Sequence, residues 1–147
     1  AMTRSMMVAV LYRLGGSPAV TGEIPFPDVE PGSWYADAIL WSEANEIVEG
    51  YDNGMFGPHD PITREQLAAI LYRYAQYKGY DVSIGEETNI LSYEDAFDIS
   101  DYAVPAMQWA VGAGIIQGDG AHLNPREYAS RAQVAAMVMR FIENVAK

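Results

Sequence analysis

The sequence predicts an all-helical protein built from a repeated pair of helices. A segment that begins with a hydroxyl residue and an arginine occurs three times, at 3–14, 63–74 and 130–141. A second segment that ends in tryptophan occurs twice, at 34–41 and 102–109. Two helical segments that recur in a fixed order are typical of repeat proteins, in which neighbouring repeats bury each other's apolar faces.

The three longer segments have the spacing of amphipathic helices. In the first copy, Met7, Val10, Leu11 and Leu14 fall on one face. Each copy begins at an N-cap hydroxyl, Thr3, Thr63 or Ser130, and glutamine three residues later completes a capping box in the second and third copies. Three such helices with one apolar face each predict a central helical bundle.

The two shorter segments predict a second kind of helix, with Trp41 and Trp109 in the core. Gly50 and Gly118 follow it, and two explanations stay open for them. They could end the helix in a left-handed conformation, or they could allow a ligand to approach the backbone closely. The loop at 51–58 contains Asn53-Gly54, a strong signal for a tight turn.

Two linkers separate the repeats. The stretch 15–27 is rich in glycine and proline, whereas 79–92 is longer and more acidic. We therefore divide the single domain 1–147 into the second half of a first repeat, 3–14, and two fuller repeats, 26–78 and 93–146. The chain starts abruptly before Thr3, so we expect a fragment of a longer protein, with an apolar edge left open for homodimerisation.

The composition excludes several classes of function. The net charge is −11, which argues against binding to nucleic acid or to anionic lipid. There is no cysteine, so disulfides and thiolate chemistry are impossible. No apolar run is long enough for membrane insertion. The two histidines lack metal-binding spacing and no nucleophile motif is present, so we expect no enzyme, metal or cofactor.

Residues 26–77 carry a dense set of motifs. They include Phe26-x-Asp28-Val29, Trp34-Tyr35, Gly50-Tyr51, Phe56-x-Pro58 and Ile62-Thr63-Arg64. Together they resemble an S-layer homology repeat. The third repeat resembles it more loosely, because Tyr93-x-Asp95 begins it and Asp119 replaces the tyrosine after the glycine.

The resemblance implies three helix–loop–helix repeats with pseudo-threefold symmetry, arranged as a three-pronged spindle. It also implies an extracellular location at the bacterial cell surface, where such domains bind secondary cell-wall polysaccharide non-covalently. The glycan often carries anionic pyruvate ketals and lies in grooves between neighbouring repeats. A protein–protein or self-assembly module of a surface-layer protein is the alternative.

The resemblance makes the arginine of the Thr-Arg motif, Arg4, Arg64 or Arg131, a main ligand contact. The residues support this, because a cation at a helix start is unfavourable unless an anion is bound there by the free N–H groups and the guanidinium together. An ion pair with Asp28 or Asp95 is the alternative, and both roles are compatible. As surface cations, these arginines would contribute little to stability.

Aromatic residues complete the candidate glycan site. Sugar rings stack on exposed aromatic faces, and Trp34 and Tyr51 flank the loop and the helix start. The predicted glycan-binding residues are Arg4, Arg64, Arg131, Asp28, Asp95, Trp34, Gly50, Tyr51 and Gly118.

Overall fold

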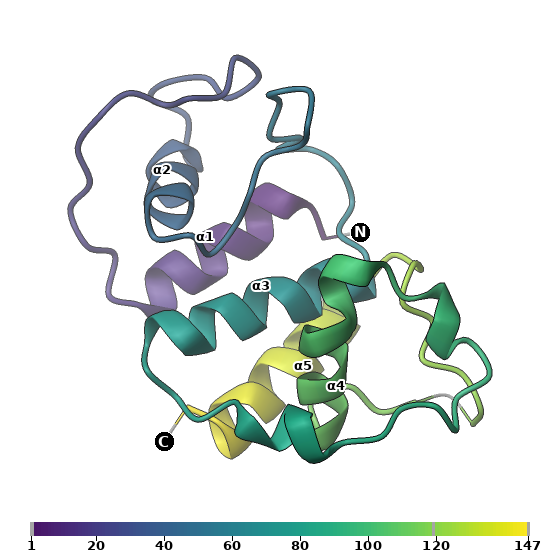
Figure 1. The fold of residues 1–147 in the computed structure, drawn as a ribbon. Helices are drawn as coiled ribbons and strands as arrows, with labels where there is room; N and C mark the ends of the chain where they lie inside the picture. The colour runs from purple at the N-terminus through teal and green to yellow at the C-terminus, as the bar shows by residue number, and fades with distance from the viewer. Residues whose placement is uncertain (1, 119, 147) are drawn as a thin grey trace. The chain divides into compact units, whose positions relative to one another are not determined.

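The computed structural model describes residues 2–118 and 120–146. Figure 1 shows its elements in chain order: α1 (Arg4–Leu14), α2 (Ala36–Ala44), α3 (Arg64–Tyr77), η1 (Ser83–Glu87), η2 (Ala96–Asp98), η3 (Asp101–Ala103), α4 (Val104–Gly112) and α5 (Arg131–Asn144). Within the described residues, extended pairing is limited to two isolated bridges. The predicted all-helical class is confirmed.

The long helices begin where the hydroxyl residues predict. The Thr3 hydroxyl accepts a hydrogen bond from the Met6 N–H at 3.2 Å. Thr63 with Gln66, and Ser130 with Gln133, form complete capping boxes. These bonds satisfy N–H groups that have no partner within the helix, and so they define the starts of α1, α3 and α5.

The chain forms two compact units, one at 2–61 and the other at 62–147. In the first unit α1 packs against α2, and in the second α3 packs against α4. Each short helix therefore pairs with the long helix that precedes it in the chain. The predicted apolar edge, where a short helix before α1 would pack, stays a prediction. A central bundle of three long helices with pseudo-threefold symmetry stays a prediction.

Each unit has its own apolar core. Both tryptophans that the sequence assigns to the core are buried, Trp41 in α2 and Trp109 in α4. The largest fully buried partners in the first unit are Met7, Leu11, Ile39 and Phe56, and those in the second are Leu67, Leu71, Tyr74 and Phe141. In the second unit, the rings of Tyr74 and Trp109 each lie within 6.1 Å of the Phe141 ring, which links α3 and α4 to α5.

The acidic linker is an ordered part of the second unit. Its turn η1 packs against α4. A Cβ atom at Gly85 would lie 3.0 Å from the Trp109 backbone, so glycine permits this close approach. Among the described residues, no helix combines the length and the apolar character that a membrane span requires.

Candidate functional site

Two of the three repeated arginines are buried by the loop of the following repeat. Arg4 is 5% exposed; its Nε donates to the Phe56 carbonyl at 3.0 Å and its Nη2 donates to the Glu49 carbonyl at 2.9 Å. Arg64 is 8% exposed, and its Nε donates to the Leu123 carbonyl at 3.0 Å. The prediction of surface cations is wrong for these two residues, because each is buried and donates to carbonyl oxygens of a loop, two for Arg4 and at least one for Arg64.

The first N–H groups of these helices are also occupied. The Arg4 N–H donates to the Asp60 carbonyl at 2.9 Å, and the Ser5 N–H donates to the Pro58 carbonyl at 3.1 Å. In the second unit, Arg64 and Glu65 donate in the same way to loop carbonyls. The hypothesis of an anion bound by free N–H groups at these helix starts is therefore wrong, since the loop takes those donors.

The carboxylates of Asp28 and Asp95 accept hydrogen bonds from the backbone of the same loops. The Asp28 carboxylate accepts hydrogen bonds from the Phe56 N–H at 2.9 Å and the Gly57 N–H at 2.8 Å. Asp95 accepts equivalent bonds from the backbone at Leu123 and Asn124, at 2.8 and 2.7 Å. These carboxylates therefore hold in place the carbonyl groups that cage the arginines.

The pKa of each aspartate reflects this position. Desolvation is the largest influence on the pKa of Asp28 and raises it. The N–H donors of Phe56 and Gly57, with a smaller contribution from the Arg4 charge, outweigh desolvation and hold the pKa below its ordinary value of 3.8. The balance at Asp95 is the same in kind, with His122 as the nearby charge.

Tyr51 covers the buried arginine of the first unit. The Arg4 guanidinium carbon lies 4.7 Å from the centre of the Tyr51 ring and 4.9 Å from that of Phe56, within cation–π range. The Tyr51 hydroxyl donates to Asp60 Oδ2 at 2.8 Å. Burial and this bond raise the pKa of Tyr51, and the Arg4 charge opposes them.

An aromatic ladder continues from this loop to the surface. Trp34 is 63% exposed, and its ring meets the Tyr35 ring edge-on, with centres 5.1 Å apart. Tyr35 in turn meets the His59 ring edge-on at 5.6 Å. His59 precedes Asp60, so the ladder joins the Tyr51–Asp60 pair along the chain. Trp34 thus presents a supported and accessible aromatic face, as a sugar-stacking residue requires.

Sequence reasoning missed Tyr35, His59 and Asp60. A signal was available, since Tyr35 directly follows Trp34 and the other two directly follow the Phe56-x-Pro58 motif. It was not decisive, because only the folded loop brings 34–35 and 59–60 together.

Both explanations for Gly50 and Gly118 need correction. Neither glycine has a left-handed conformation. The left-handed residues after the two short helices come earlier in the chain, at Glu46 with φ 60° and at Gly114 with φ 75°. A Cβ atom at Gly50 would lie 2.3 Å from the Phe26 ring, and one at Gly118 would lie 2.4 Å from the Tyr93 ring. The close approach is therefore real, but its partner is an aromatic side chain of the same repeat.

The structure gathers the predicted residues into two sites and leaves one outside. Arg4, Asp28, Trp34, Gly50 and Tyr51 meet in the first unit. Arg64, Asp95 and Gly118 meet in the second, where Asp119, the counterpart of Tyr51, lies outside the described residues. Arg131, at the exposed start of α5, belongs to neither site.

The second site differs from the first in its polar groups. Arg126 and Tyr102 occupy the places of His59 and Trp34 in the repeat. Arg126 Nε donates to the Asp98 carbonyl at 2.9 Å and lies 4.0 Å from Oε1 of the buried Glu65. The two sites thus share the caged arginine and the clamping aspartate but not the aromatic ladder. No group of three metal-ligating side chains occurs within the described parts of the chain.

Comparison with known proteins identifies a repeated family pattern. The profile of the S-layer homology domain matches residues 25–68 and 92–135. The chain is 32% identical to a surface-layer 125 kDa protein of Lysinibacillus sphaericus, over 84% of this chain and 10% of that protein. It is 32% identical to an endoglucanase of Bacillus sp. (strain KSM-635), over 99% of this chain and 15% of the enzyme.

A third relative is a cellulosome-anchoring protein of Acetivibrio thermocellus, which is 24% identical over 97% of this chain and 32% of its own length. The chain therefore spans only a small part of these relatives. The names of these relatives range from an enzyme to surface proteins.

Proposed function

We propose that this chain, which belongs to the S-layer homology domain family, anchors a protein at the cell surface by binding secondary cell-wall polysaccharide. Modules of this family anchor proteins at the cell surface. The bound glycan is anionic and carries pyruvate ketals. The segment itself is not catalytic in this proposal, and any enzymatic activity would reside in other parts of a longer protein. The alternative of a protein–protein or self-assembly module stays open.

The arrangement from Arg4 to Trp34 carries this proposal. It joins a cation from one repeat to aromatic side chains of the next, within residues 2–61. A pyruvate ketal offers a carboxylate, and a sugar ring offers an apolar C–H face. The first suits a site with the Arg4 charge beneath it, and the second suits the exposed indole of Trp34.

The overall charge makes such a local cation important. A protein of net charge −11 repels an anionic polymer at long range. Attraction must therefore arise close to the surface, where the Arg4 charge lies under the Tyr51 ring and is screened less than an exposed cation.

Calorimetry with two matched probes tests the proposal. One is purified pyruvylated wall polysaccharide, and the other is the same polysaccharide after mild acid has removed its ketals. We expect binding of the first probe only. Trp34→Ala should weaken that binding about tenfold, through loss of the stacking face.

Met139→Ala serves as the control, because Met139 is also an exposed apolar residue but lies on α5. Equal binding of both probes would refute the role of the ketal. If Trp34→Ala binds as the wild type does, the aromatic ladder is not the glycan site.

A further inference from the structure

One face of α5 carries an exposed apolar stripe. Its four residues recur at a spacing of three or four, so they share one side of the helix: Ala132, Ala135, Met139 and Ile142. Met139 is 55% exposed and Ile142 is 43% exposed. The solvent-facing side of a helix is usually polar, and a continuous exposed apolar surface marks an interaction site. We call these four residues the α5 stripe.

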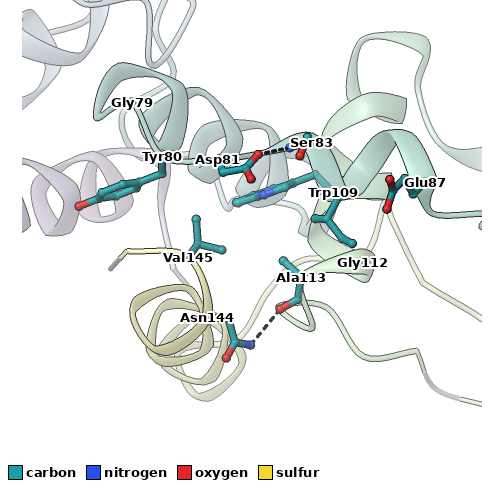
Figure 2. A pocket seen from close by; sticks show the side chains of 11 residues that line it. Gly79, Tyr80, Asp81, Ser83, Glu87, Trp109, Gly112, Ala113, Asn144 and Val145 are labelled. Carbon is teal, nitrogen blue, oxygen red and sulfur yellow. Dashed lines mark hydrogen bonds between the residues drawn. The ribbon is translucent and has the colours of Figure 1, made fainter.

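The opposite face of α5 is held within the second unit. The Phe141 ring lies 6.0 Å from the Tyr74 ring and 6.1 Å from the Trp109 ring. Figure 2 shows Asn144 at the end of α5, where its Nδ2 donates to the Ala113 carbonyl at 2.9 Å. The stripe is therefore the side of α5 that its own unit leaves uncovered.

The equivalent faces of α1 and α3 are covered by short helices. Met139 corresponds in the sequence repeat to Tyr12 and Tyr72. The Tyr12 ring lies 5.4 Å from that of Trp41 in α2, and the Tyr72 ring lies 5.5 Å from that of Trp109 in α4. At two further stripe positions, both of these helices carry buried residues: Ser5, Val8, Glu65 and Ala68.

The starts of the three helices differ in the same way. In α1 and α3, loop carbonyls accept from the first two N–H groups at distances between 2.8 and 3.1 Å. In α5 the equivalent residues, Arg131 and Ala132, are exposed, and no loop carbonyl among the described residues accepts from their N–H groups. The covering loop follows the covering short helix in the chain, so one short helix with its loop accounts for both features of α1 and α3.

We infer that the α5 stripe is a docking surface for the first half of a further S-layer homology repeat. This partner is a short helix with a central tryptophan, together with the loop that follows it. The tryptophan packs beside Met139, and two loop carbonyls accept from the N–H groups of Arg131 and Ala132. A second copy of this chain is not the occupant, because α2 and α4 already pack against α1 and α3.

Hydrogen exchange in an extended chain tests the inference. A second copy of residues 78–129 is joined after Asn144, in place of 145–147, so that α5 is followed by the same linker, short helix and loop as α3. The two long helices have the same length, 14 residues each. We expect the N–H groups of Arg131 and Ala132 to exchange at least about tenfold more slowly than in the original chain, as measured by NMR.

A charge in the stripe should prevent docking. Met139→Glu should remove this protection from the extended chain, because the carboxylate would be buried against the docked helix. Leu14→Glu is the matched control, since Leu14 is an apolar helix residue that is 42% exposed but lies on α1. Exchange at the buried residues Leu67 and Leu71 of α3 shows in the same spectra whether the second unit stays folded.

Three results would overturn the inference. They are unchanged exchange at Arg131 and Ala132 in the extended chain, protection that survives Met139→Glu, and protection in the original chain that rises with its concentration. The third result would place a second copy on the stripe. None of these measurements involves a glycan, so failure of this inference is distinguishable from failure of the proposed function.

Discussion

The three repeated arginines have the same sequence context but different surroundings. Arg4 and Arg64 are buried and donate to loop carbonyl groups, whereas Arg131 is exposed at the start of α5. Periodicity alone could identify all three as equivalent. It could not distinguish them, because burial depends on whether a loop from another repeat covers the helix start.

Removal of a caged arginine should therefore affect folding. Arg4→Ala leaves two carbonyl groups without their donor, so we expect the free energy of unfolding to fall by about 3 kcal/mol. Arg131→Ala should change it by less than about 0.5 kcal/mol. Urea denaturation followed by circular dichroism measures both. Equal stability of the two variants would contradict the carbonyl cage.

Asp28 should make the stability of the first unit depend on pH. Its pKa is lower in the folded chain than the ordinary 3.8, so its contribution is complete above that value and is lost as pH falls below it. Asp28→Asn replaces one acceptor by a donor that faces a backbone N–H. We expect lower stability at pH 7 and a flatter decline below about pH 4.

Unfolding experiments at pH 7 and pH 3, on the wild type and on Asp28→Asn, measure this dependence. Glu30→Gln is a suitable control, because Glu30 is exposed on the same loop. A parallel decline in the wild type and in Asp28→Asn would show that this carboxylate does not contribute to the acid sensitivity.

At the level of elements, the sequence predicted the presence of the helices, but it did not predict where α2 and α4 end. Hydroxyl caps and apolar spacing located α1, α3 and α5, because both signals act within a few residues. The ends of α2 and α4 were misplaced toward Gly50 and Gly118. The left-handed residue after α2 is Glu46, which carries no glycine signal, and the real constraint on Gly50 is the distant Phe26 ring.

The packing at Gly50 gives a test of this interpretation. Gly50→Ala places a methyl group within 2.3 Å of the Phe26 ring, so we expect a loss of about 1–3 kcal/mol from overpacking. Gly15→Ala is the control, because its nearest neighbour is at 3.4 Å and its φ is −81°. Thermal unfolding compares the two, and equal midpoints would contradict the role given to Phe26.

In the whole molecule, the boundaries of the compact units do not coincide with the boundaries of the sequence repeats. The sequence repeats pair each short helix with the long helix that follows it. In the compact units, α2 lies with the preceding helix α1, and α4 lies with both α3 and α5. Sequence self-similarity fixes the period and cannot fix this pairing. The predicted homodimer through the open edge of the first repeat remains to be tested by light scattering.

Fragments of the chain should reveal the pairing. We expect residues 62–147 to unfold cooperatively on their own, since they retain α3, α4 and α5. Residues 26–78 span a sequence repeat but separate α2 from α1 and α3 from α4. Circular dichroism should show substantial helix in the first fragment and little in the second. The reverse result would contradict the pairing described above.

The repeated docking of an arginine helix onto the next loop also bears on recombination among such chains. Arg4 docks on the loop at Phe56 as Arg64 docks on the loop at Leu123. A crossover between Pro61 and Ile62 would exchange complete folding units, whereas a crossover in either linker would split one. If one whole repeat were lost or gained at this point, each buried arginine would still have a loop with which to form its hydrogen bonds. The number of repeats could therefore change by unequal crossing-over without the evolution of a new interface.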